Sequence, residues 1–191
     1  LSLASPAHLE AAKLGKAYFN TDTANVSDKF KGMSVEDINS ELRKNANPFA
    51  VCFEHWIGDF NLGTGVRNAN AFNAKEVFYI GDKKWDRRSA VGVYNYTPIT
   101  WLSSIDELLL LKDKYTIVGI DNVTGSVPMK TYQWQPNTLM VFGEEGAGLT
   151  PGMQALCKDI VAIEMFGSVR SLNCGTASGI VMYDFINKLS I

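Results

Sequence analysis

The first 48 residues of this chain carry apolar side chains at helical spacing. Within residues 7–18 the apolar positions, among them Leu9, Ala12 and Leu14, have the spacing of a helix, which predicts one there. Ser34, followed by Asp37 three residues later, forms a capping-box pattern that predicts a second helix through Leu42. We therefore expect residues 1–48 to form a short N-terminal helical extension.

From residue 49 onward, short apolar runs alternate with amphipathic segments. The apolar runs predict buried strands at Phe49–Phe53, Glu76–Ile80, Tyr115–Ile120, Thr138–Phe142 and Ile160–Ile163. The segments between them predict helices at Val66–Phe72, from a Ser104 cap through Lys112, from Thr150-Pro151 to about Cys157, and at Leu172–Leu189. Strands that alternate with helices predict an α/β domain over residues 49–191, with a mostly parallel sheet flanked by helices.

The composition excludes several classes of protein. Hydrophobic types make up 46% of the 191 residues and charged types 20%, which suits a folded domain rather than a disordered chain. No apolar run approaches the length of a bilayer span, so we expect no membrane association. The formal net charge of −2 gives no overall attraction to nucleic acid, so an RNA contact requires a local basic patch.

The chain begins at Leu1 without a Met, and we expect it to be processed or part of a longer protein.

Cysteine and histidine usage limits the metal and nucleophile chemistry. The three cysteines are widely spaced and form no CxxC pair, so we expect neither a disulfide framework nor a zinc site, and a reducing, cytoplasmic compartment. His8 and His55 cannot supply an HExxH site, and a Ser–His–Asp triad would have to be built on one of them. We therefore expect no metal.

Three polar loops each follow a predicted strand, at Asp59–Arg67, Gly143–Leu149 and Glu164–Asn173. Ligands of open parallel sheets bind beyond the carboxyl ends of the strands, so these loops predict one composite site.

Taken singly, each loop has an ordinary structural explanation. Gly143–Leu149 lacks both the Gly-Lys-Ser/Thr of a P-loop and the G-x-G-x-x-G dinucleotide pattern, and fits a plain strand-to-helix turn. Arg67 fits a surface arginine that follows an Asn helix cap. Ser171 or Asn173 fits the N-cap of the closing helix.

Taken together, the three loops resemble the three motifs of the SpoU–TrmH branch of the SPOUT RNA methyltransferases, in order and in spacing. The matching residues are Asn61, Gly63 and Arg67 in the first motif, Gly143, Glu145, Gly148 and Leu149 in the second, and Ser171, Leu172 and Asn173 in the third. The resemblance covers roughly Phe49 to the C-terminus. Three residues depart from the family pattern: Glu164 stands where the family usually has Pro, and Cys174-Gly175 stand where it tends to have Val-Ser.

The resemblance implies a C-terminal deep trefoil knot, S-adenosylmethionine as cofactor, and methyl transfer to a ribose 2′-hydroxyl of structured RNA such as tRNA or rRNA. It assigns hydroxyl activation to Arg67 acting with an RNA phosphate, since no histidine lies in the motifs. The implied catalytic residues are Arg67, Asn61, Glu145, Ser171 and Asn173. The residues expected to bind the cofactor are Ile120, Gly143, Gly148, Ile163, Met165, Ser171 and Leu172.

One charged loop is a candidate RNA surface. Lys83-Lys84-Trp85-Asp86-Arg87-Arg88 groups four basic residues around an aromatic one, which offers phosphate attraction and a stacking surface. We expect Lys83, Lys84, Trp85, Arg87 and Arg88 to contact RNA. The alternative is a solvated loop with Trp85 folded back on the domain.

The resemblance also implies a homodimer, and the closing helix gives an independent reason. Its apolar residues spread around more of the helix than a single core-facing stripe requires, so a partner subunit or the N-terminal helices must cover a second face.

Two other functions stay open from the sequence alone. The departures at Glu164 and Cys174 allow a catalytically weak or inactive knotted RNA-binding module. A nucleotide-binding protein that uses Gly143–Gly148 as a phosphate loop is the third possibility.

Overall fold

The computed structural model describes residues 26–56, 60–144 and 146–189. Seven strands form one sheet in the order β3-β2-β1-β6-β4-β7-β5, and all neighbouring strands pair in parallel. The strands are β1 (Asn47–Glu54), β2 (Ala74–Ile80), β3 (Ile99–Leu102), β4 (Thr116–Ile120), β5 (Val127–Pro128), β6 (Thr138–Phe142) and β7 (Asp159–Ala162). The predicted α/β architecture with a mostly parallel sheet is confirmed.

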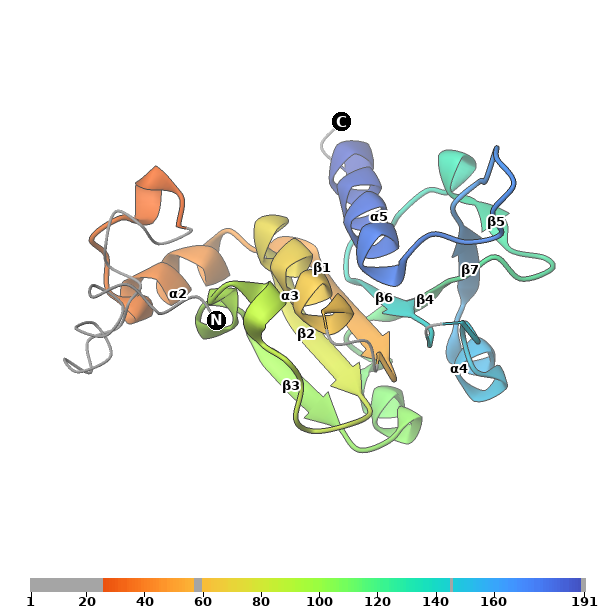
Figure 1. The fold of residues 1–191 in the computed structure, drawn as a ribbon, viewed down its shortest axis with the longest axis horizontal. Helices are drawn as coiled ribbons and strands as arrows, with labels where there is room; N and C mark the ends of the chain where they lie inside the picture. Colours follow the sequence, from red (N-terminus) through yellow and green to blue (C-terminus); the bar gives the residue numbers. More distant parts are fainter. Residues whose placement is uncertain (1–25, 57–59, 145, 190–191) are drawn as a thin grey trace, which may run out of the picture.

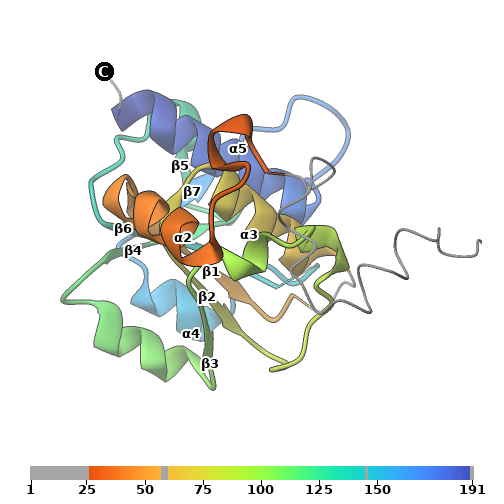
Figure 2. The same ribbon diagram turned by 90° about the vertical axis from the view of Figure 1, so that its left-hand side faces the viewer.

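Helices lie on both faces of this sheet, as Figures 1 and 2 show. The α-helices are α2 (Val35–Lys44), α3 (Asn61–Ala71), α4 (Pro151–Leu156) and α5 (Cys174–Leu189). The 3-10 helices are η2 (Asp28–Phe30), η3 (Arg88–Ala90), η4 (Val93–Asn95), η5 (Ile105–Leu111) and η6 (Met129–Thr131).

The central strand β1 separates two hydrophobic cores. Successive side chains of a strand point to opposite faces, so Phe49, Val51 and Phe53 pack with α3 and α5, whereas Ala50 and Cys52 pack on the η5 and α4 side. All five side chains are fully buried, which explains why this strand reads as a continuous apolar run in the sequence.

The N-terminal segment is described from residue 26, so the helix predicted over 7–18 lies outside the described residues. The second predicted helix is confirmed as α2, with Ser34 as its N-cap accepting a hydrogen bond of 3.1 Å from the Asp37 N–H. Ile38 is the buried residue of this helix, and the Asn73 side chain donates to the Leu42 carbonyl at 3.1 Å. In Figure 1, α2 lies at one end of the molecule, away from α4 and β7.

The prediction of a loop over Asp59–Arg67 is wrong for most of its length, because α3 begins at Asn61 and not at Val66. Gly63 and Gly65 suggested a turn, but both lie inside the helix and serve close packing. A Cβ on Gly63 would lie 2.0 Å from Ser89 Oγ, and a Cβ on Gly65 would lie 2.6 Å from the Phe53 ring.

Three further details differ from the prediction. Strands β3 and β5 were not predicted, since they are four and two residues long and carry little periodicity. Ser104 makes no side-chain cap: the Glu107 N–H donates to the Ser104 backbone carbonyl at 3.4 Å, and the Glu107 carboxylate accepts from the N–H and hydroxyl of Ser103. The closing helix begins at Cys174 and not at Leu172.

Within the part of the chain that the structure describes, no helix is both long and apolar enough to cross a bilayer. The same residues hold no group of three or more His, Cys, Asp or Glu side chains that could bind a metal ion.

Candidate functional site

A cavity of about 680 Å³ lies at the carboxyl edge of β4, β6 and β7. Residues of three segments line it, each segment continuing from one of these strands: 120–123, 142–144 with 146–148, and 163–177. The cavity brings together all the residues predicted to bind the cofactor, namely Ile120, Gly143, Gly148, Ile163, Met165, Ser171 and Leu172. Sequence reasoning missed Asp121, Asn122 and Val123, although their place directly after the β4 strand was a usable signal.

The Gly143–Leu149 loop closes on itself at the cavity wall. The N–H of Glu144 donates to the Gly148 carbonyl and the N–H of Gly148 donates to the Glu144 carbonyl, both at 2.9 Å. A Cβ on Gly143 would lie 2.2 Å from the Gly148 backbone, and Gly148 has a φ of +76°. Both positions therefore require glycine.

The carboxylate of Asp121 accepts the next donor of this loop, the N–H of Leu149, at 2.7 Å. Two N–H groups of Gly143–Gly148, those of Glu144 and Gly148, are thus bonded within the protein, and a carboxylate accepts the N–H that follows them. This arrangement argues against a phosphate-binding role for Gly143–Gly148, since such a loop keeps its N–H groups directed at the anion.

A buried network below the cavity fixes the same loop. Trp56 Nε1 donates to the Gly143 carbonyl at 2.8 Å, and the Thr150 hydroxyl donates to the fully buried Glu54 side chain at 2.6 Å. The Thr150 oxygen also accepts from the Met153 N–H, which makes Thr150 the N-cap of α4, as predicted. The loop is therefore anchored at both of its ends.

Asn173 occupies the junction between the third cavity segment and α5. Its Oδ1 accepts from the Thr176 N–H at 3.1 Å, which caps the helix. Its Nδ2 donates to Asn61 Oδ1 at 3.0 Å, which joins this junction to the start of α3. The same two helices are linked further along, where Asn68 Nδ2 donates to the Gly175 carbonyl at 2.9 Å and to the buried Ser178 hydroxyl at 3.0 Å.

The model of the SpoU rRNA Methylase family matches residues 48–183. The chain belongs to this family.

Curated relatives of this SpoU chain include 23S rRNA (guanosine-2′-O-)-methyltransferases RlmB. The one from Pasteurella multocida is 25% identical over 166 residues, which cover 83% of this chain and 67% of the relative. The one from Coxiella burnetii is 29% identical over 153 residues, which cover 76% of this chain and 61% of the relative. The chain thus spans about two thirds or less of the length of these relatives.

Solved SpoU structures share the fold. The SpoU methyltransferase AviRb from Streptomyces viridochromogenes, in complex with the cofactor AdoMet, superposes with a TM-score of 0.69 at 25% identity, covering 75% of this chain and 62% of that one. The TrmH/SpoU tRNA modifying enzyme of A. aeolicus superposes with a TM-score of 0.71 at 21% identity, covering 82% and 84% of the two chains.

The SpoU motif residues predicted to be catalytic do not all meet in one place. Ser171 and Asn173 line the cavity, and Asn61 contacts Asn173. Arg67 lies further along α3 with an exposed side chain, and it is not among the residues that line the cavity. Glu145 lies outside the described residues.

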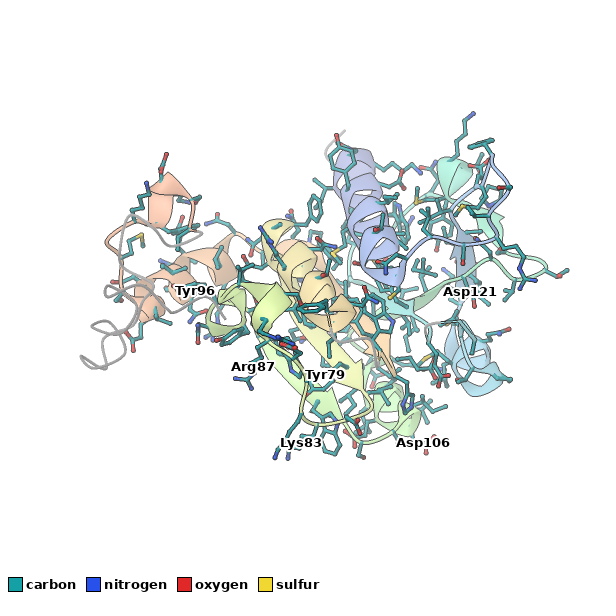
Figure 3. The ribbon with its side chains drawn as sticks, viewed as in Figure 1. Tyr79, Lys83, Arg87, Tyr96, Asp106 and Asp121 are labelled. Carbon is teal, nitrogen blue, oxygen red and sulfur yellow. The ribbon has the colours of Figure 1, made fainter. Side chains whose placement is uncertain are left out.

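The predicted RNA surface of this SpoU chain lies beside α3, on the β2–β3 side of the molecule. Figure 3 shows Lys83 and Arg87 there, with Asp121 on the β4–β7 side. Lys83, Lys84, Arg87 and Arg88 are exposed, whereas Trp85 is partly buried and packs against the core, as the alternative interpretation expected.

Aromatic rings contact three of these cations, one of which is Arg88 over the Phe60 ring. Arg87 lies over both the Trp85 ring, at 5.7 Å, and the Tyr94 ring, at 5.1 Å, and Lys83 lies 5.0 Å from the Trp101 ring centroid. The loop is therefore an ordered basic surface, held by cation–π contacts.

Proposed function

We propose that this chain is an S-adenosylmethionine-dependent RNA methyltransferase that acts on a ribose 2′-hydroxyl of rRNA or tRNA. The observation that carries the proposal is the single cavity at the carboxyl edge of the sheet, lined by two of the three SpoU motifs and joined to the first motif by the Asn61–Asn173 hydrogen bond. The 23S rRNA 2′-O-methyltransferases among its relatives and the AdoMet complex among its structural neighbours support the same activity.

The cavity suits the cofactor in size and in chemistry. Its volume of about 680 Å³ lies within the range of pockets that enclose small ligands. Ile120, Ile163 and Leu172 supply apolar walls for a flat base, and Gly143 and Gly148 keep side chains off one wall. When bound, S-adenosylmethionine supplies an activated methyl group.

The protein must position the acceptor hydroxyl and shift its proton, because a ribose hydroxyl is a weak nucleophile. We assign the proton shift to Arg67 acting together with an RNA phosphate, whose oxygens match the planar fork of a guanidinium. Asn61, held by Asn173, orients the start of α3, and Ser171 faces the reacting centre from the cavity wall. Glu145 positions the arginine or the substrate.

We propose that the active form is a homodimer in which two chains share each site. Arg67 is exposed and lies outside the lining of its own cavity, which supports a role at the cavity of a second copy. Helix α5 buries Val181, Met182 and Phe185 but leaves Ile180 and Tyr183 exposed, at 37% and 60%, so it carries a second apolar face. Mixing Arg67→Ala chains with Asn173→Ala chains restores activity if the site is shared, and light scattering that gives the mass of one chain contradicts the dimer.

We also propose the trefoil knot over the C-terminal segment and a division of the chain into an extension, 1–48, and a methyltransferase domain, 49–191. The connection between β4 and β6 contacts the segment leading into α5 and α5 itself, which supports threading. Asn122 Nδ2 donates to the Arg170 carbonyl at 3.0 Å, and Trp134 Nε1 donates to Asp184 at 2.7 Å.

The three cysteines form no disulfide, which suits the reducing cytoplasm that we propose as the location.

The basic surface at residues 83–88 is the proposed path of the RNA. Changing Lys83 and Lys84 to Glu lowers RNA affinity, and it reduces the slope of log affinity against log salt by about one for each lost phosphate contact. Arg88 is a poor choice for this test, because its ion pair with Asp86 makes it part of the loop structure. An unaltered slope would place the RNA elsewhere.

In the direct test, the protein is incubated with bulk tRNA and rRNA in the presence of labelled S-adenosylmethionine. Methylated ribose in the RNA is then mapped by mass spectrometry. Methylated ribose at a defined nucleotide is the expected result. RNA binding without any methylated ribose would instead favour a knotted RNA-binding module.

A further inference from the structure

Phe60 is a half-exposed aromatic residue at the entrance to α3. Its side chain is 51% exposed, although it directly precedes Asn61 of the first SpoU motif. Its backbone carbonyl accepts hydrogen bonds from the Thr64 N–H at 2.9 Å, the Thr64 hydroxyl at 2.8 Å and the Ser89 hydroxyl at 2.8 Å. The backbone of residue 60 is thus held by these contacts, which do not involve the ring.

Arg88 covers part of this ring. Its guanidinium lies 5.0 Å from the ring centroid, and Asp86 holds it there through hydrogen bonds of 3.0 and 2.8 Å from Arg88 Nε. A cation over an aromatic ring is favourable, and here it leaves half of the phenyl side chain open to solvent.

The other aromatic residues of the basic surface are already engaged. Trp85 and Tyr94 pack against the core and lie under Arg87, and Trp101 donates its indole N–H to the Gly81 carbonyl at 2.9 Å beneath Lys83. All three are partly buried, so Phe60 is the most exposed ring among the described aromatic residues of this surface.

We propose that Phe60 stacks on a nucleobase of the RNA next to the nucleotide that receives the methyl group. This inference rests on the proposed function. Asn61 and Asn173 mark the edge of the cavity at which the acceptor ribose must lie, and Phe60 is the neighbouring residue in the chain. The exposed cations Lys83 and Lys84 give the surrounding surface the charge that an RNA backbone requires.

The occupant is a nucleic acid base because an exposed ring within a basic surface is the arrangement by which proteins hold single-stranded bases. Every base has a flat π-face, so such stacking adds affinity with little dependence on sequence. A protein partner would instead be expected to meet a larger apolar surface with fewer charges.

The test uses the full chain and compares Phe60→Ala with Phe60→Trp. One probe is a 12-nucleotide oligoadenylate that contains 2-aminopurine, whose fluorescence falls when it stacks, and the other is a 23S rRNA transcript in the methylation assay. Phe60→Ala raises the RNA Kd and KM roughly 5- to 150-fold, the effect of losing one base–aromatic stack. Phe60→Trp restores both values, and Phe60→Leu, which keeps apolar area without a π-face, does not.

The affinity for S-adenosylmethionine, kcat and Tm stay at their wild-type values in Phe60→Ala, because the backbone contacts of residue 60 remain. Leu110→Ala is the matched control, since Leu110 is 81% exposed on η5, which packs on the other face of the sheet. An unchanged KM and unchanged quenching would overturn the proposal. So would a joint fall of kcat and Tm, which indicates a structural role, or a shift from dimer to monomer, which indicates a subunit contact.

Failure of the proposed function gives a different pattern. If the wild-type protein transfers no methyl group but still quenches 2-aminopurine, and Phe60→Ala does not, then stacking stands without the enzymatic activity. If the wild-type protein methylates RNA and Phe60→Ala matches it in KM, the activity stands and the role of Phe60 is wrong.

Discussion

The side-chain amide of Asn173 donates a hydrogen bond of 3.0 Å to Oδ1 of Asn61, a residue 112 positions earlier in the chain. The same asparagine caps α5 through its Oδ1. One side chain thus starts the closing helix and also joins the first and third SpoU motifs.

These two roles of Asn173 can be separated. Asn173→Asp keeps an oxygen that caps α5 but loses the donor to Asn61, so we expect nearly wild-type stability with methyl transfer lowered roughly 10- to 100-fold by misplacement of the site. Asn173→Ala loses both contacts, and its free energy of unfolding falls by about 1 kcal/mol in addition. Urea denaturation and methylation rates measure the two effects. Equal activity of Asn173→Asp and wild type would remove the Asn61 contact from the mechanism.

Arg67→Ala should lower the rate of methyl transfer about 10²- to 10⁴-fold, the usual contribution of a residue that assists proton transfer. Binding of S-adenosylmethionine should stay intact, because Arg67 does not line the cavity. Isothermal titration and single-turnover kinetics give the two quantities. Arg67→Lys is the control that keeps the charge without the planar fork, and only a partial recovery is expected. A parallel loss of cofactor affinity would assign Arg67 a structural role.

The Glu54–Thr150 pair should contribute to the stability of the protein. Thr150→Val removes the hydroxyl that donates to the buried Glu54 and accepts from the Met153 N–H. The free energy of unfolding should fall by about 2–4 kcal/mol, through a lost N-cap and an unpaired buried oxygen. Thr150→Ser restores the hydroxyl and most of the stability. A Thr150→Val protein within about 0.5 kcal/mol of wild type would contradict this account.

Alkylation at pH 8 should distinguish the three cysteines. Burial, and next the charge of Glu54, raises the pKa of the Cys157 thiol to about 12, and the same causes raise the pKa of the Cys52 thiol. A raised pKa leaves the thiol protonated, so at pH 8 only about one Cys157 side chain in 10⁴ is the reactive thiolate.

Cys174 lines the cavity and is only partly buried, so iodoacetamide should modify it first. S-adenosylmethionine should slow that modification, and peptide mass mapping reads both results. Cys174→Ser removes the labelling if the assignment is correct. Rapid modification of Cys157 in the folded protein would show that its surroundings open readily.

The sequence predicted the sheet and the grouping of residues around the cavity better than it predicted the first motif. Apolar runs such as Thr138–Phe142 coincide with their strands because parallel strands are buried on both faces. The start of α3 was missed because glycines such as Gly63 and Gly65 are typical of turns when only their neighbours in the sequence are considered. Their actual role depends on Ser89 and Phe53, which only the folded chain brings close.

Residues that act through distant partners were beyond the sequence signals used. Asn173 was recognised as a possible cap, but its contact with Asn61 depends on how α5 crosses α3. The exposure of Phe60 likewise depends on the basic loop, whose own aromatic residue, Trp85, packs against the core. Periodicity and motif spacing describe one segment at a time, so they do not report such pairings.

The position of β6 in the sheet bears on how the molecule folds. This strand comes late in the chain, yet it lies between β1 and β4, with Cys52 paired to Val141 on one side and Gly119 paired to Val141 on the other. Until β6 has paired with both of its neighbours, no hydrogen bonds join β1 to β4 and the edge of the sheet that forms the cavity is incomplete. Contacts of such long sequence separation slow folding, because the chain must close large loops before they become favourable. Refolding should therefore be slow, and the cavity should be among the last parts of the protein to form.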